Sequence, residues 1–168
     1  MEEGCRLKFD YAKVYWNSKL QYEHKRLVGL FKPSDIICDV FCGVGPFSLP
    51  AAKKGCTVFS NDLNPDSIHW LTQNISTNRI RPNRITVYNL DGREFIQRAV
   101  KELDKLNEGR FDHFIMNLPA IAYQFLDVFS ELQEEGLIGA SAKIHCYTFC
   151  KDDADPVDVK SFDILAVP

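Results

Sequence analysis

The stretch of sequence that decides the fold is Cys38-Asp39-Val40-Phe41-Cys42-Gly43-Val44-Gly45-Pro46-Phe47. The apolar residues just before it predict a buried strand, which ends in an acidic residue and two nearby glycines. The residues after it, 46–54, can open a helix. Glycine adopts backbone dihedrals that other residues avoid and lets a ligand approach the main chain closely. A strand, a tight glycine turn and a helix are typical of the first unit of a nucleotide-binding α/β domain.

The pattern D-x-F-x-G-x-G-P-F in this stretch differs from the dinucleotide motif G-x-G-x-x-G. The third glycine is missing, and a carboxylate precedes the first one. The pattern resembles the first motif of methyltransferases that use S-adenosylmethionine (AdoMet). Taken alone, it also fits a turn with a purely structural purpose.

Length and composition predict one domain over residues 1–168, because a chain this long with 45% hydrophobic residues can bury a sizeable core. Within it we expect an aromatic N-terminal segment and helix (1–34), a nucleotide-binding α/β core (35–150) and an acidic tail (151–168). No stretch has the pattern of a signal peptide or the length of a membrane span. The net charge of −3 is unusual for a protein that binds nucleic acid unaided.

The six cysteines do not predict a metal site. Their spacings lack the C-x2-C pairs of structural zinc sites, and most fall in apolar stretches where a thiol behaves as a small hydrophobe. We therefore expect no metal and read the thiols as reduced, which is typical of an intracellular protein.

Glu23 and His24 lie on the inward side of a helix predicted over residues 20–31. Burying a carboxylate beside an imidazole is unfavourable unless other polar groups form hydrogen bonds with them. From spacing alone, a Glu reaching solvent and a hydrogen-bonded core His explain the pair better than a functional site does.

Polar side chains follow several predicted strands. Asp62 ends the second strand, 57–60, at the place where an acidic residue accepts the ribose hydroxyls in dinucleotide-type folds. Asn64 and Pro65 suit the start of the next helix. Asp91, after the third strand, has the spacing of a capping residue with Glu94, and could also lie with Gly92 against an adenine edge.

Asn117 follows the fourth strand, 111–116, and precedes Leu118 and Pro119. Such a sequence is a turn signal, but an amide there can also donate to and accept from the edge of a base. With a fifth strand over 143–149, the chain predicts an α/β fold: a Rossmann-like, doubly wound parallel sheet in which these residues share the carboxyl edge.

Five motifs stand together at this point: residues 15–20, 39–47, 61–65, 89–93 and 116–120. Their order and spacing resemble the catalytic domain of the eukaryotic and archaeal tRNA (guanine-N1)-methyltransferases, class I AdoMet-dependent enzymes that modify guanosine 37, next to the anticodon. The resemblance covers roughly residues 7–152. It implies AdoMet as cofactor, bound by His24, Asp62, Leu63, Asp91, Gly92 and Asn117. It implies Glu23 as general base, with Tyr15, Asn117 and Pro119 around the guanine.

The resemblance also implies tRNA as partner, bound mainly through an N-terminal region that this chain lacks, and a monomer without membrane contact. By the same resemblance the location is cytoplasm, nucleus or mitochondrial matrix. We expect the tail 151–168 to be too short for the closing pair of strands. Two alternatives remain: an AdoMet-binding relative without activity, and a related enzyme such as the aminocarboxypropyl transferase of wybutosine synthesis.

Overall fold

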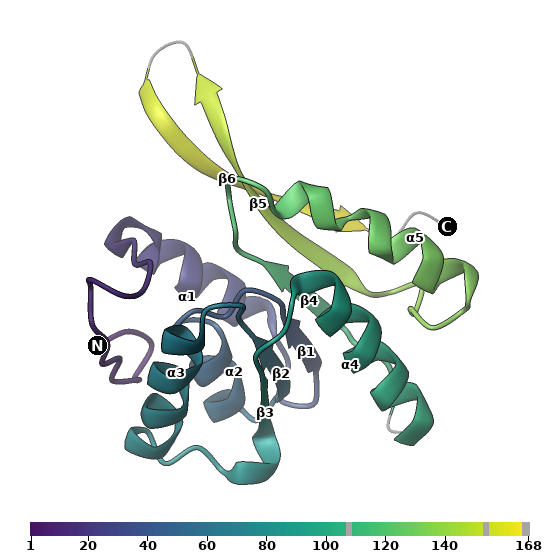
Figure 1. Ribbon diagram of the computed structural model, residues 1–168, viewed down its shortest axis with the longest axis horizontal. Coiled ribbons are helices and arrows are strands. Elements are labelled where there is room, and N and C mark those ends of the chain that lie inside the picture. The colour runs from purple at the N-terminus through teal and green to yellow at the C-terminus, as the bar shows by residue number, and fades with distance from the viewer. Residues whose placement is uncertain (107–108, 153–154, 166–168) are drawn as a thin grey trace.

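A six-stranded sheet with the strand order β3-β2-β1-β4-β5-β6 forms the centre of the computed structural model (Figure 1). The structure describes residues 1–106, 109–152 and 155–165, and side chains as far as residue 149. The first five strands are parallel, which confirms the predicted doubly wound sheet. The strands are β1 Ile36–Asp39, β2 Thr57–Asn61, β3 Ile85–Tyr88, β4 His113–Met116, β5 Lys143–Asp152 and β6 Asp155–Leu165.

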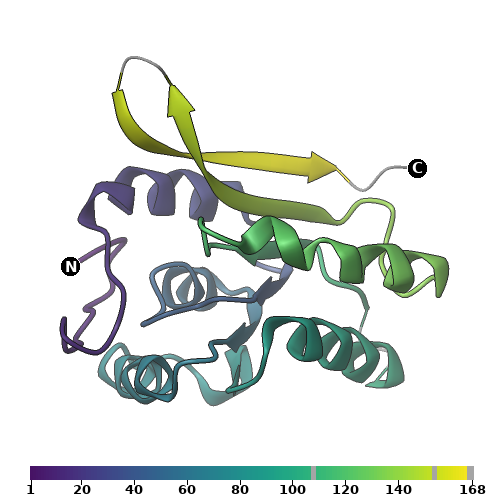
Figure 2. The same cartoon turned by 45° about the horizontal axis from the view of Figure 1, so that its top comes forward.

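Helices cover both faces of the sheet (Figure 2). They are α1 Gln21–Leu30, α2 Ser48–Lys54, α3 Pro65–Thr77, α4 Gly92–Leu106 and α5 Asp127–Glu134, with short 3-10 helices η1 Ser18–Leu20, η2 Pro82–Arg84 and η3 Ala122–Phe125. Leu27, Leu49 and Leu71 of the first three helices share one core cluster with Ile37, and α4 and α5 share the other with Cys38. Successive strand residues point to opposite faces, so β1 is buried from both sides.

The tail, expected to be too short for a closing pair of strands, forms a single strand within its described residues. Residues 155–165 form β6, which pairs antiparallel with β5 from Lys143↔Leu165 to Asp152↔Asp155. β5 itself continues past the predicted end at residue 149. The tail is acidic in composition but also contains Val157, Val159, Phe162 and Ile164, which suit a strand, and strand pairing depends on backbone groups and not on net charge.

The helical segment after residue 121 is divided: η3 ends at Phe125, and α5 begins at Asp127. In a continuous helix the amide of Val128 would donate to the carbonyl of Gln124. Here Val128 donates to Asp127 Oδ1 at 3.0 Å, and Arg93 Nη2 donates to the Gln124 carbonyl. The Arg93 guanidinium also lies 4.6 Å from the centroid of the Phe125 ring. Arg93 therefore ties the start of α4 to the helix break.

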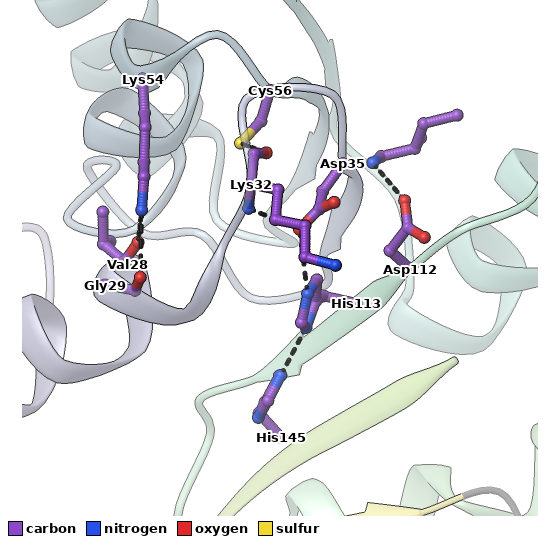
Figure 3. A network of polar contacts seen from close by, with 10 residues as sticks. Val28, Gly29, Lys32, Asp35, Lys54, Cys56, Asp112, His113 and His145 are labelled. Atoms are coloured by element: carbon purple, nitrogen blue, oxygen red, sulfur yellow. Dashed lines mark hydrogen bonds and ion pairs between the residues drawn. The ribbon is translucent and has the colours of Figure 1, made fainter. Parts of the chain in front are cut away.

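A buried polar network lies at the amino ends of β4 and β5 (Figure 3). His113 Nε2 lies 3.3 Å from Asp35 Oδ2, and His113 Nδ1 lies 2.9 Å from His145 Nε2. Phe31 packs against both imidazole rings. Burial lowers the pKa of His113, although Asp35 opposes the shift. The sequence pattern did not single out these residues.

Neither a metal cluster nor a membrane-spanning helix occurs within the described part of the chain. The cysteines whose side chains are described are buried free thiols: Cys5, Cys38, Cys42, Cys56 and Cys146. Burial raises their pKa, that of Cys56 to about 11. The side chain of Cys150 lies outside the described residues.

Candidate functional site

A cavity of about 420 Å³ lies where the segments that follow β1, β2 and β4 meet. This is the carboxyl edge of the sheet, beside the point where the strand order reverses between β1 and β4, and ligands bind there in such folds. The lining comes from the glycine loop, from the N-terminal segment, from the start of α3 and from residues 117–120, with Phe149 of β5.

The structure brings five of the predicted site residues into this lining: Tyr15, His24, Asp62, Asn117 and Pro119. Four others lie outside it: Glu23, Leu63, Asp91 and Gly92. The lining also includes residues that the sequence interpretation did not assign, among them Trp16, Asn17, Phe41 and Phe149. Trp16 and Asn17 belong to the motif at residues 15–20, so that motif could have identified them as lining residues from the sequence.

The glycine loop needs glycine at two positions for different reasons. Gly43 and Gly45 have φ values of 53° and 96°, in the left-handed region that other residues rarely adopt. A Cβ atom on Gly45 would also lie 2.6 Å from Leu71 Cδ1, whereas one on Gly43 would meet nothing within 4 Å. Gly45 therefore has both a backbone and a packing requirement.

Asp62 fastens this loop. Its Oδ2 accepts a hydrogen bond of 2.8 Å from the amide of Gly43, and its Oδ1 accepts one of 2.8 Å from Asn64. Burial raises the pKa of Asp62, and the two amide donors and the Ser67 hydroxyl act against that shift. An ionised carboxylate has about four acceptor positions, so Asp62 retains capacity for a ligand hydroxyl beside the bonds from these two amides and from the Ser67 hydroxyl.

Asn61 joins three strand ends beneath the cavity. Its Nδ2 donates to the carbonyls of Val40 at 3.1 Å and Leu90 at 3.0 Å, and its Oδ1 accepts from the Leu90 amide at 2.9 Å. The side chain is fully buried. A satisfied buried amide of this kind holds the loops after β1 and β3 at a set distance from β2.

His24 lies on the cavity wall and is buried, with 2% of its surface exposed. Its Nδ1 lies 2.8 Å from Glu2 Oε2, and because a carboxylate only accepts hydrogen bonds, Nδ1 carries a proton. Burial lowers the pKa of His24, and the bond to Glu2 opposes this. The ring packs edge-on against Phe47 at 4.7 Å.

Glu23 points elsewhere, since successive helix residues are rotated by about 100°. Its carboxylate forms two hydrogen bonds of 2.7 Å with Arg26 and accepts one of 2.9 Å from the Tyr147 hydroxyl. About 20% of the side chain is exposed. In this structure Glu23 therefore belongs to an ion pair beside the cavity.

Phe41 stands between Gly92 and the cavity. A Cβ atom on Gly92 would lie 2.9 Å from the Phe41 ring and 3.0 Å from that of Phe125. These two rings meet edge to face at 5.0 Å. Asp91 is exposed and caps α4 by accepting from the amide of Arg93 at 2.9 Å, as the spacing predicted. Leu63 is 67% exposed.

Asp39 is a buried carboxyl group under the glycine loop, and sequence reasoning gave it no role. Its Oδ2 accepts a hydrogen bond of 2.5 Å from Ser48, which in turn accepts one of 2.8 Å from Ser60. Burial raises the pKa of Asp39 to about 7, although the Ser48 bond opposes the shift. The signal was its position directly before the glycine turn.

Two buried acceptor atoms have no partner among the described residues, Asp39 Oδ1 and Asn117 Oδ1. Buried polar atoms are nearly always hydrogen-bonded, and an unpaired one is unfavourable by about 1–3 kcal/mol. Asn117 also lines the cavity, so a ligand with a hydrogen-bond donor would satisfy it.

Comparison with known proteins shows which family this chain resembles in sequence. The family model described as the TRM5/TYW2 methyltransferase domain matches residues 1–163. The chain is 45% identical over 169 residues to the tRNA (guanine(37)-N(1))-methyltransferase of Xenopus tropicalis, covering 95% of this chain and 34% of that protein. It thus spans about a third of the length of such relatives.

Solved structures agree with the observed fold. The crystal structure of Trm5b from Pyrococcus abyssi superimposes with a TM-score of 0.73 at 34% identity, over 90% of this chain and 40% of that one. TYW2 of M. jannaschii, solved in complex with AdoMet, gives a TM-score of 0.70 at 25% identity over 91% and 63%. With the match to residues 1–163, the chain belongs to the TRM5/TYW2 methyltransferase domain family.

Proposed function

We propose that this chain binds AdoMet and is the catalytic domain of a tRNA (guanine(37)-N1)-methyltransferase. The observation that carries the proposal is the cavity at the carboxyl edge of the sheet, which gathers the glycine loop, Asp62 and Asn117. The 45% identity to a protein named for this activity supports methyl transfer to N1 of guanosine over other transfer reactions of AdoMet.

The residues present fit AdoMet. The glycine loop leaves its backbone open to a ligand, Asp62 has acceptor capacity for ribose hydroxyls, and Asn117 Oδ1 is a buried acceptor without a partner among the described residues. His24 adds a buried imidazole to the wall. When bound, AdoMet supplies an electrophilic methyl group. The contribution of the chain is to hold donor and acceptor in line and to exclude water.

N1 of guanine carries a proton at neutral pH, so a base must remove it as the methyl group is transferred. We assign the role of this general base to Glu23, which lies next to His24 in α1. Its carboxylate is ion-paired with Arg26 in this structure, so it would change partners when guanosine enters. Asn117 and Tyr15 would then position the guanine ring, since both line the cavity.

A second candidate is an AdoMet-binding domain without catalysis. The observation that favours it is that Glu23 is held outside the cavity by Arg26 and Tyr147. In that case the cavity would bind AdoMet, but the Glu23 carboxylate would not reach the guanine.

A methylation assay separates the two candidates. Undermodified tRNA transcripts are incubated with AdoMet and this chain, alone and joined to the part of the Xenopus relative that this chain does not match. We expect N1-methylguanosine at position 37 from the joined protein, detected by mass spectrometry and primer extension. AdoMet binding without any modified tRNA would favour the non-catalytic alternative.

Glu23→Gln tests the base in the joined protein. The single-turnover rate should fall roughly 10²–10⁴-fold, as expected for loss of a general base, while AdoMet affinity stays unchanged. A near-normal rate would mean that the proton leaves by another route.

A further inference from the structure

Asn74 of α3 and Asn78, the C-cap residue of that helix, hold the N-terminal segment as a neighbouring strand would. Asn74 Oδ1 accepts from the amide of Lys8 at 2.9 Å, and its Nδ2 donates to the carbonyl of the same residue at 3.1 Å. One turn later, Asn78 makes the same pair of bonds with Arg6, at 2.7 and 2.8 Å. Positions i and i+4 of a helix share a face, as do positions i and i+2 of an extended segment.

Asn74 makes one contact that Asn78 does not. Its Nδ2 also donates to the carbonyl of Val44 in the glycine loop, at 3.2 Å. The second donor bond of Asn78 instead goes back to the carbonyl of Asn74 in α3. The Asn74 side chain is fully buried, and both of its donor hydrogens and its oxygen are used.

The contact to Val44 fixes a peptide group of the glycine loop. The Val44 carbonyl is bonded to Asn74, and the Gly45 amide of the same peptide donates to the Cys42 carbonyl at 2.9 Å. The two ends of a trans peptide point in opposite directions, so this plane is held from both sides. Asp62 holds the preceding residue, Gly43, through its amide.

The segment held by Asn74 also supplies a wall of the cavity. After Lys8 the chain crosses to the start of α3, where Asn64 Nδ2 donates to the carbonyl of Lys13 at 2.9 Å. It then reaches Tyr15 and Trp16, which line the cavity. Figures 1 and 2 both show this N-terminal segment beside α3.

We propose that Asn74 is a positioning residue that sets the glycine loop and the N-terminal wall relative to each other, and thereby sets the affinity of the cavity for AdoMet. The inference rests on the proposed function of the cavity. It deepens that function, because it assigns part of the binding energy to an amide that does not line the cavity.

The experiment compares AdoMet binding by calorimetry in the unmodified chain, Asn74→Ala, Asn74→Asp and the matched control Asn78→Ala. Thermal unfolding of each protein is recorded in parallel. Each alanine substitution removes two hydrogen bonds to the N-terminal segment, but only the one at Asn74 also removes the bond to the Val44 carbonyl. We expect AdoMet to bind about tenfold more weakly after either change at Asn74, the effect of about one lost hydrogen bond.

The control Asn78→Ala should bind AdoMet within about twofold of the unmodified chain while its unfolding temperature falls. Equal weakening in Asn78→Ala would overturn the inference, since docking of the segment alone would then explain the effect. Unchanged affinity in a folded Asn74 variant would overturn it as well. No binding by the unmodified chain would contradict the proposed function itself, and this inference with it.

Asn74→Asp covers the case in which the alanine variant does not fold. It keeps the side-chain size and the acceptor for the Lys8 amide, and it loses both donors. A further measurement needs no variant: saturating AdoMet should slow hydrogen exchange at the Lys8 amide, because coupling between two sites is reciprocal. An unchanged exchange rate at Lys8 would also overturn the inference.

Discussion

At the scale of single residues, the site depends on carboxylates that serve the loop as well as a ligand. Asp62 accepts from two backbone amides and lines the cavity, and Asp39 lies fully buried beneath the same loop. Both pKa values are raised by burial. Their effects on binding and on stability can be separated by mutation.

We expect Asp62→Ala to weaken AdoMet binding by roughly 1–3 kcal/mol, because it leaves loop amides and ligand hydroxyls without an acceptor. Asp62→Asn should have a smaller effect, since it retains one oxygen acceptor in the same place. Calorimetry with both variants measures the difference. Unchanged affinity in the alanine variant would remove Asp62 from the cofactor site.

Asp39→Asn should change how stability depends on pH. The pKa of Asp39 is raised from 3.8 to about 7, so the folded protein keeps a proton there that the unfolded chain releases. The free energy of unfolding therefore falls as pH rises between these values, and the loss is complete above pH 7. Removing the ionisable group should eliminate roughly 2–3 kcal/mol of this loss between about pH 5 and about pH 8.

Urea unfolding of both proteins at several pH values measures this slope. His24 and His113 act in the opposite direction: burial lowers their pKa, so their contribution is lost as pH falls below about 6.5. They are present in both proteins and cancel in the comparison. The same slope in wild type and Asp39→Asn would mean that Asp39 ionises in its ordinary range.

At the scale of elements, the turn between β1 and α2 depends on glycine at two positions. Gly45 combines a positive φ with close packing against Leu71 and Leu49, whereas Gly43 has the positive φ alone. We expect Gly45→Ala to lower the free energy of unfolding by roughly 2–4 kcal/mol, the sum of backbone strain and overpacking. Gly43→Ala, the matched control, should cost roughly 1–2 kcal/mol.

Chemical denaturation of the two glycine variants gives both values. Equal losses would show that Leu71 and Leu49 move aside and that packing adds nothing at Gly45.

At the scale of the whole molecule, we expect the chain alone to bind tRNA weakly and with little selectivity. Phosphate contacts dominate nucleic-acid affinity, and the 20 basic residues here are scattered among 23 acidic ones. The densest basic stretch, residues 79–84, precedes β3 and so lies at the amino edge of the sheet, away from the cavity. Arg84 there donates to the carbonyl of Gly55.

A gel-shift titration at physiological salt, with tRNA and an unrelated RNA of equal length, measures this. One base stacked on Tyr15 would contribute roughly 1–3 kcal/mol, too little for tight binding. Submicromolar, tRNA-selective binding by these 168 residues would place an RNA-binding surface on the domain itself.

Sequence patterns predicted the parts of this protein that depend on local chemistry. The glycine turn, the Asn64-Pro65 helix start and the Asp91 cap follow from backbone preferences within a few residues, and the structure has all three. The alternation of predicted strands with helices also predicted a doubly wound sheet, and with it the edge at which Asp62 and Asn117 both line the cavity.

Only the tertiary structure decided which side chains face the cavity and which partners they have. Glu23 and His24 are neighbours in sequence, yet one is paired with Arg26 and Tyr147 and the other lines the cavity against Glu2. The bonds of Asn74 to Lys8 and Val44 join segments far apart in the chain. Such contacts depend on how helices and strands pack, and spacing along one segment carries no information about a partner that another segment supplies.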